Sequence, residues 1–324
     1  MRLLLFFSIL LLPGAWRLNS AIGPSQSSAA SSSTTVKPET QPSPLALRVS
    51  TTLVLIPVTV SDPSNRFVLG LDKQDFRVFE DGAEQKIKQV SGEDAPLSVG
   101  ILVDTSGSMG AKLEISRQAV DQFLKTMNAQ DEAFLIEFSD KAELISGFTR
   151  QTQNLDEKLT SVESRGLTAL LDAVDLGLKE MKKAANPRKA LLIISDGGDN
   201  NSRYTAAEIE NLVREADVQI YAMGVFETLP YMPTTAAEVL GPRLLSELAR
   251  ETGGRAFPAS SSADLPKIAR RIGVELRNQY VLAYSPSNQD RNGKFRHVDV
   301  KLKQPDGLPV LKARWRSGYY APRQ

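Results

Sequence analysis

The chain contains no cysteine and only one histidine, His297, among its 324 residues. The absence of cysteine excludes disulfides, thiol nucleophiles and zinc–thiolate sites, and a single histidine excludes any metal site that needs several imidazoles. A Ser-His-Asp hydrolase would have to use His297, which lies in a late segment with strand-like alternation. The chemistry open to this protein therefore rests mainly on carboxylates and hydroxyls.

Net charge and long apolar runs are also lacking. The formal net charge is +1, so no overall electrostatic field attracts nucleic acid or an anionic membrane. The apolar stretch at residues 3–12 is shorter than the ~20 residues that span a bilayer. We expect no nucleic-acid partner, and no membrane span in the mature protein. The length is sufficient for about two domains.

The N-terminus has the pattern of an export signal. A basic start at Arg2 precedes the apolar stretch, and small residues follow at Ala15 and at Ser20-Ala21. This pattern predicts a cleaved signal peptide over residues 1–21, with an uncleaved membrane anchor as the alternative. We therefore expect a secreted, periplasmic or cell-surface protein. Residues 22–44 are rich in Ser, Thr and Pro and predict a disordered linker.

Two segments, residues 45–96 and 278–324, have the alternating, β-branched pattern of strands. In the first segment, Glu80-Asp81-Gly82 predicts a turn between short strands at 76–78 and 87–90. We predict that the late strands pair with the early ones in one sandwich-like β domain. Two separate small β units are the alternative.

Residues 97–277 have a different pattern, that of an α/β domain. Continuous apolar runs near residues 97–103, 189–195 and 218–225 are typical of strands buried on both faces of a parallel sheet. Amphipathic helical patterns separate these runs, and residues 133–139 and 142–148 predict two further strands, the second at an edge. The alternation predicts a doubly wound, mostly parallel, Rossmann-like sheet, inserted in or flanked by the β segments.

Short oxygen-bearing side chains follow the predicted buried strands. Asp104 ends the first run, with Ser106 and Ser108 close behind it, and Asp196 ends the second. Thr168 precedes a predicted helix. Ligands of open α/β sheets gather outside the carboxyl ends of the strands. Two carboxylates and three hydroxyls suit Mg²⁺, or Mn²⁺ or Ca²⁺. Taken singly, each residue could instead be a turn former or a helix cap.

The pattern Asp104-x-Ser106-x-Ser108, followed by Thr168 and Asp196, resembles the metal-ion-dependent adhesion site of von Willebrand factor type A domains. The resemblance covers about residues 97–276. It implies that the three hydroxyl residues are direct or state-dependent ligands of the ion, that the two aspartates act mainly through water, and that a partner's acidic residue completes the shell. The flanks resemble secreted proteins related to this family that are abundant in Acidobacteria. Asp199-Asn200-Asn201 is an addition that could tune the site or form a solvated loop.

These features favour a non-enzymatic, exported module that binds an acidic residue of a protein partner through a divalent cation. The alternative is a structural or assembly factor of the cell envelope, in which the metal site is secondary. An Mg²⁺-dependent phosphotransferase with Asp104 as nucleophile would need a second carboxylate two residues later. Ser106 occupies that position, so we expect no enzyme activity.

Overall fold

The computed structural model describes residues 53–92, 95–159, 163–226, 236–303 and 310–323. All of these lie in one compact unit spanning residues 50–324. The predicted signal peptide (1–21), the predicted linker (22–44), residues 45–52 and the sequence Asp306-Gly307 lie outside the described residues. No helix in the described part of the chain is long and apolar enough to cross a membrane.

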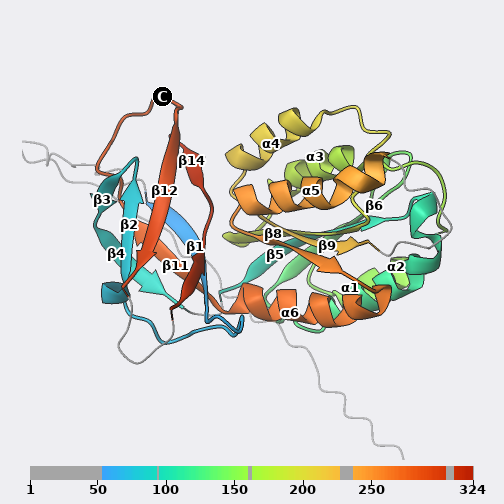
Figure 1. Cartoon of the computed structure of the whole chain (residues 1–324), viewed down its shortest axis with the longest axis horizontal. Helices are drawn as coiled ribbons and strands as arrows, with labels where there is room; N and C mark the ends of the chain where they lie inside the picture. Colours follow the sequence, from blue (N-terminus) through green and yellow to red (C-terminus); the bar gives the residue numbers. More distant parts are fainter. Residues whose placement is uncertain (1–52, 93–94, 160–162, 227–235, 304–309, 324) are drawn as a thin grey trace, which may run out of the picture. The chain divides into compact units, whose positions relative to one another are not determined.

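A six-stranded sheet forms the centre of the α/β part (Figure 1). Its strands are β5 (Leu97–Asp104), β6 (Glu132–Phe138), β7 (Ala142–Thr149), β8 (Arg188–Ser195), β9 (Gln219–Val225) and β10 (Arg255–Ala259). Their order is β10-β9-β8-β5-β6-β7, and only β7, at the edge, runs antiparallel to its neighbour. The predicted mostly parallel sheet, including its edge hairpin, is confirmed.

Helices cover both faces of this sheet, as a doubly wound fold requires (Figure 1). One face carries α1 (Leu113–Leu124), α2 (Gln153–Leu159) and α6 (Leu265–Arg277), and the other carries α3 (Leu170–Met181), α4 (Ala206–Glu215) and α5 (Ala236–Glu251). Short 3₁₀ turns lie at η1 (Lys73–Asp75), η2 (Gly107–Lys112) and η3 (Ser262–Asp264). The capping box of Thr205 and Glu208 begins α4.

The remaining strands form two antiparallel four-stranded sheets. One has the order β13-β1-β11-β4 and the other β14-β12-β2-β3. Their bounds are β1 (Val54–Ser61), β2 (Phe76–Glu80), β3 (Ala83–Gln85), β4 (Ile87–Ser91), β11 (Gln279–Tyr284), β12 (Phe295–Leu302), β13 (Lys312–Arg314) and β14 (Gly318–Tyr320). One apolar cluster, to which β1, β2, β11 and β12 all contribute, fills the space between the two sheets.

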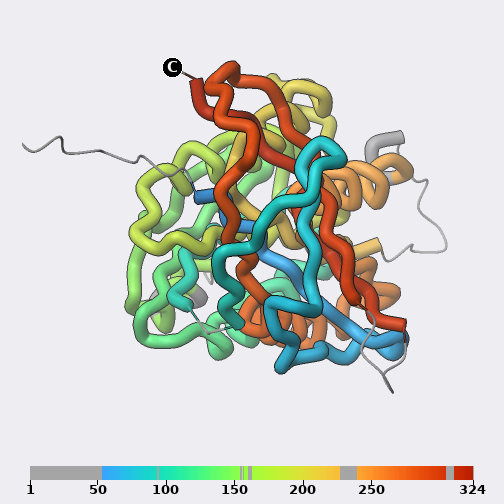
Figure 2. Tube along the Cα trace, turned by 90° about the vertical axis from the view of Figure 1, so that its left-hand side faces the viewer, coloured from blue at the N-terminus to red at the C-terminus, as the bar shows by residue number. Residues whose placement is uncertain are grey.

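Early and late strands pair across the α/β insertion. β1 pairs with β11, with Ile56 opposite Leu282, and β2 pairs with β12, with Val78 opposite Val300. Figure 2 shows these early and late segments side by side. The predicted pairing of the two β segments is therefore confirmed, because each sheet contains strands from both ends of the described chain.

One detail of the predicted β segment is wrong. Asp81 and Gly82 do form a tight turn, with φ values of 49° and 84°. The strand that returns from this turn is the short β3, which pairs with β2. The strand at Ile87–Ser91 pairs instead with β11 in the opposite sheet. The chain crosses between sheets after Gln85, and an alternating pattern cannot show which sheet a strand joins.

Candidate functional site

The predicted site lies where two central strands end side by side. β5 and β8 are parallel neighbours, with Val103 opposite Ile194, so Asp104 and Ser195 lie at the same edge. From β5 the chain continues to β6 on one side and later returns to β8 on the other. This reversal of strand order is the position at which open α/β sheets form ligand sites. Every residue of β5 is buried, which holds Asp104 rigidly against its neighbours.

Asp104 is fully buried, and its carboxylate is held at both oxygens. Oδ1 accepts a hydrogen bond from the Ser106 N–H at 2.9 Å, and Oδ2 accepts one from Ser195 Oγ at 2.6 Å. Burial, together with the negative charge of Asp196 nearby, raises the pKa of Asp104 to about 6. The two carboxylates therefore lie close enough to repel each other, which is a situation that a bound cation would relieve.

The two serines lie in the loop that leaves β5. Their Oγ atoms are 3.1 Å apart, with Ser106 buried and Ser108 exposed. Ser106 precedes the 3₁₀ turn η2, but its side chain makes no capping hydrogen bond to that turn. The buried side chain of Met109 anchors the loop in the apolar core. The hydroxyls of both serines are thus not used as helix caps.

Thr168 lies in a second loop, which is tied to the first by main-chain hydrogen bonds. The Gly107 N–H donates to Gly166 O at 3.0 Å, and the Arg165 N–H donates to Thr105 O at 2.9 Å. Thr168 is nearly buried, and its hydroxyl makes no hydrogen bond to any residue in the described part of the chain. The N-cap of α3 is Ala169, so the alternative role of Thr168 as its N-cap is excluded.

Asp196 lies in a third loop, directly after β8. Its Oδ1 accepts a hydrogen bond from the Gly198 N–H at 3.2 Å, and its Oδ2 lies 3.9 Å from Lys112 Nζ. Gly197 has a φ of 79°, and a Cβ there would lie 2.6 Å from the carbonyl of Gly241. Only glycine fits this position, and so the turn that presents Asp196 depends on it.

Several groups at the site carried no signal of their own in the sequence. Ser195 joins β8 to Asp104, and Lys112 lies against Asp196. The Asp199-Asn200-Asn201 addition is partly exposed, yet Asn200 bonds to Thr168. Ser195 could have been found from its position at the end of a strand adjacent to β5. The contacts of Lys112 and Asn200 join distant segments and have no local pattern.

The donor set fits a hard divalent cation. Mg²⁺ binds oxygen at 2.0–2.1 Å in octahedral geometry, so neighbouring ligands lie about 3 Å apart. The separation of the Ser106 and Ser108 hydroxyls, 3.1 Å, matches that spacing. In the part of the chain that the structure describes, no three His, Cys, Asp or Glu side chains are grouped to hold a metal. A cation at this edge would therefore depend on hydroxyls as well as on the two carboxylates.

Comparison with known proteins identifies the α/β part. Residues 99–198 match the family model of the von Willebrand factor type A domain. These residues form a von Willebrand factor type A domain. The matched segment of the type A domain runs from β5 to just beyond β8, and it contains all five predicted site residues.

Relatives of the type A domain are distant. An uncharacterized protein of Borreliella burgdorferi is 23% identical over 181 residues, which cover 49% of this chain and 53% of the relative. Inter-alpha-trypsin inhibitor heavy chain H4 of Sus scrofa is 25% identical over 185 residues, covering 52% of this chain and 19% of the relative. This chain thus spans about half of the first relative and a fifth of the second. A solved type A structure from Catenulispora acidiphila is 13% identical, with a TM-score of 0.49, and covers 76% of this chain and 74% of its own.

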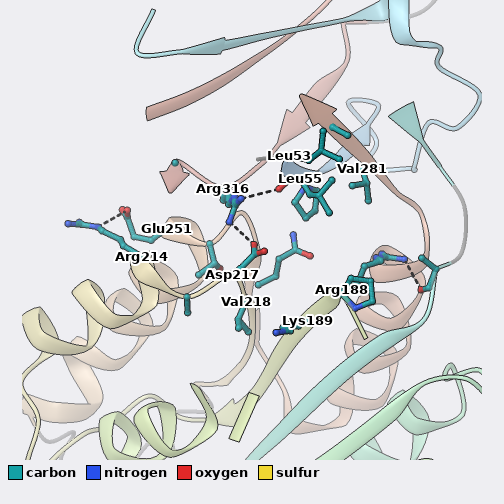
Figure 3. Close-up of a pocket in the computed structure, with 18 of the residues that line it drawn as sticks. Leu53, Leu55, Arg188, Lys189, Arg214, Asp217, Val218, Glu251, Val281 and Arg316 are labelled. Carbon is teal, nitrogen blue, oxygen red and sulfur yellow. Dashed lines mark hydrogen bonds and ion pairs between the residues drawn. The ribbon is translucent and has the colours of Figure 1, made fainter. Parts of the chain in front are cut away.

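A cavity of about 250 Å³ lies at the opposite edge of the central sheet (Figure 3). The first residues of β8 and β9 line it on one side, and Leu53, Leu55 and Val281 of the β sandwich line it on the other. Arg316 reaches across, donating to Asp217 Oδ1 at 2.6 Å and to Leu55 O at 3.0 Å. This cavity contains none of the predicted site residues, so it is separate from the strand-end site of the type A domain.

Proposed function

We propose that this protein binds a divalent cation through its type A domain and uses the cation to bind a carboxylate of a protein partner. Mg²⁺ is the proposed ion, with Mn²⁺ or Ca²⁺ as substitutes. The residues that would hold it are Asp104, Ser106, Ser108, Thr168 and Asp196. The presence of a type A domain supports the broader role, protein interaction.

The observation that carries this proposal is the juxtaposition of the two aspartates. Asp104 is fully buried and Asp196 almost so, and the negative charge of Asp196, added to burial, raises the pKa of Asp104. Buried carboxylates of this kind are stable when they are paired with positive charge or bound to a metal. Among the described residues, Asp196 pairs with the Lys112 ammonium at 3.9 Å, which is a weak pairing.

The chain's own groups would orient the ion and leave one side of it open. Ser195 and the Ser106 N–H hold the Asp104 carboxylate in one orientation. Ser108 is exposed at the surface, so an ion bound beside it would be accessible to a second protein. When bound, the cation would offer an open coordination position, and its positive charge would attract an incoming carboxylate.

We propose a binding role and not an enzymatic one. Ser106 stands two residues after Asp104, where a phosphotransferase of the aspartate-nucleophile type needs a general acid. Its main chain donates to Asp104, and a serine hydroxyl cannot serve as that acid. An exported location, and kinship with secreted proteins of Acidobacteria, remain part of the proposal and rest on the N-terminal and flanking sequence.

Calorimetric titration of EDTA-treated protein with Mg²⁺ tests the cation site. The wild type is expected to bind one equivalent, and Asp104→Ala is expected to abolish binding because the ion loses a buried negative charge. Glu114→Gln is the matched control, since Glu114 is an exposed carboxylate on α1 that pairs with Arg117. Lack of saturable binding by the wild type would refute the cation site.

Pull-down from an envelope extract tests the partner. Capture is expected to be lost with EDTA, restored by Mg²⁺ and absent for Asp104→Ala. Capture that survives both EDTA and Asp104→Ala would instead support the alternative, an assembly factor that docks through its β sandwich.

Mg²⁺-dependent hydrolysis of phosphoesters by the wild type, lost in Asp104→Ala, would favour the phosphotransferase.

A further inference from the structure

The loop that follows Asp196 makes a set of hydrogen bonds that converge on Thr168. The Thr168 N–H donates to Asn200 Oδ1 at 2.8 Å. Thr168 O accepts from the N–H groups of Asn200 and Asn201, both at 3.0 Å. The N–H and the C=O of one residue are thus bonded to a single short segment of another loop.

We infer that Asn200 is a positioning residue of the cation site, which fixes the Thr168 hydroxyl relative to Asp196. Asn200 follows Asp196 by four residues, so the three bonds connect the loop carrying the acid directly to the loop carrying the hydroxyl. This inference rests on the proposed function, because the hydroxyl matters only if it ligates an ion.

Thr168 lies outside the helices and strands, and its neighbours Leu167 and Ala169 are held by N–H groups that donate to Asp140 Oδ1 and Ser139 O. Thr168 precedes α3, which begins after Ala169. The Thr168 hydroxyl has no hydrogen-bond partner among the described residues. Gly166, two residues earlier, has a φ of 78°, a conformation that other residues rarely adopt. The direction of the Thr168 side chain therefore depends on bonds made to its main chain.

A second pair of bonds secures the same loop from the side of β6. The Leu167 N–H donates to Asp140 Oδ1 at 2.8 Å, and Asn201 Nδ2 donates to Asp140 O at 2.7 Å. Asn201 contacts Thr168 only through its main chain, whereas Asn200 contacts it through both main chain and side chain. Replacing the Asn200 side chain therefore removes a contact with Thr168, whereas replacing the Asn201 side chain does not.

The side chain of Asn200 is exposed, so its replacement removes one hydrogen bond without leaving a cavity in the core. Groups that orient metal ligands typically contribute 10–100-fold to affinity. We expect Asn200→Ala to weaken Mg²⁺ binding about tenfold, because the freed loop lets the Thr168 hydroxyl move. Asn200→Asp keeps an oxygen that accepts the Thr168 N–H, and is expected to bind Mg²⁺ at least as tightly as the wild type.

The experiment is calorimetric titration with Mg²⁺ alone for the wild type, Asn200→Ala, Asn200→Asp and Asn201→Ala. Asn201→Ala is the comparison variant from the same loop: it removes the bond to Asp140 O but no side-chain contact with Thr168, and it is expected to weaken Mg²⁺ binding less than Asn200→Ala does. Amide hydrogen exchange in EDTA gives a readout that is independent of the ion. The Thr168 amide is expected to exchange faster in Asn200→Ala and at the wild-type rate in Asn200→Asp.

The outcomes separate this inference from the proposed function. If the wild type binds Mg²⁺ and Asn200→Ala binds it equally well, Asn200 has no positioning role, although the cation site stands. Equal weakening by Asn201→Ala, or by Asn200→Asp, would show that the integrity of the loop matters and not the side chain of Asn200. If the wild type binds no Mg²⁺, both the proposed function and this inference fall.

Discussion

At the scale of single residues, Asp104 is a carboxylate that the fold removes from water. Its carboxylate has no exposed surface, and its pKa of about 6 compares with an ordinary value of 3.8. Between those two pH values the folded protein holds the proton more tightly than the unfolded chain. The contribution of this group to stability is therefore fully present below about pH 4, and it is lost as the pH rises through about 6.

This shift predicts a pH-dependent effect of Asp104→Asn. In EDTA at pH 7.5, the variant is expected to be more stable than the wild type by about 2 kcal/mol, because a neutral amide avoids the cost of a buried charge. The difference should shrink as the pH falls through about 6 and approach zero below about pH 4. Urea unfolding at a series of pH values measures it. A difference that is constant across this range would show that the ionisation of Asp104 is not perturbed.

Lys112 is the second residue whose charge bears on the site. Its ammonium lies 3.9 Å from Asp196 Oδ2 and 3.4 Å from Val225 O, and the side chain is mostly buried. A positive charge at this position opposes an incoming cation. We expect Lys112→Met to tighten Mg²⁺ binding about three- to tenfold, since the like-charge repulsion is removed.

Calorimetry at low and high salt measures the effect of Lys112→Met. Lys125→Met is the control. Lys112 and Lys125 are the N-cap and C-cap residues of α1, and Lys125 forms an exposed pair with Asp121. Weaker Mg²⁺ binding by Lys112→Met would mean that Lys112 supports the geometry of the site more than it repels the ion.

At the scale of elements, β5 packs so closely against its neighbouring strands that there is no room for a side chain at Gly100. A Cβ at this position would lie 2.2 Å from Phe134 Cζ and 2.5 Å from Leu191 Cδ2. Phe134 belongs to β6 and Leu191 to β8, so both neighbouring strands close over the glycine. The same closeness holds the ends of β5 and β8 together at the candidate site.

Gly100→Ala is expected to destabilise the fold by about 1–3 kcal/mol, because overpacking displaces β6 or β8. Urea unfolding measures the loss. In Gly92→Ala the added Cβ would meet the Tyr280 ring at 3.7 Å, an ordinary contact, so this control should change stability little. Similar small effects for both variants would show that the sheet adapts to a methyl group.

At the scale of the whole molecule, a partly buried ion pair connects the type A domain to the β sandwich. Glu275 of α6 is fully buried, and its Oε1 accepts from Arg314 of β13 at 2.7 Å and from the Tyr221 hydroxyl at 3.3 Å. Glu275 Oε2 has no hydrogen-bond partner among the described residues. The carboxylate therefore depends strongly on Arg314.

Arg314→Met is expected to destabilise the protein by about 3 kcal/mol, because it leaves the buried carboxylate of Glu275 without its hydrogen-bonded cation. Thermal unfolding followed by calorimetry measures the change. Arg77→Met is the control, since Arg77 and Glu84 form an exposed pair within the sandwich whose loss should cost less than about 1 kcal/mol. Comparable losses for both variants would contradict the structural role of the Glu275–Arg314 pair.

Much of the fold could be predicted because its elements have strong local patterns. β5 is fully buried and β8 is buried at every residue but Lys189, and both were predicted from continuous apolar runs; α4 was predicted from its capping box. The helix α2 was missed, because its sequence contains two apolar residues, Leu155 and Leu159, in an otherwise polar segment. The domain boundaries after residues 96 and 277 stay predictions.

The sequence by itself determined the donors of the candidate site and the edge of the sheet to which they come. Aspartate at the end of an apolar run must lie at the carboxyl edge of a parallel strand, so Asp104 and Asp196 could be placed without coordinates. That these residues bind a metal stays a prediction. Only the tertiary structure showed that Ser195 holds Asp104, that Lys112 lies against Asp196 and that Asn200 clamps Thr168. These contacts join residues from separate segments, and a local pattern contains no information on which loops meet after the strands have assembled.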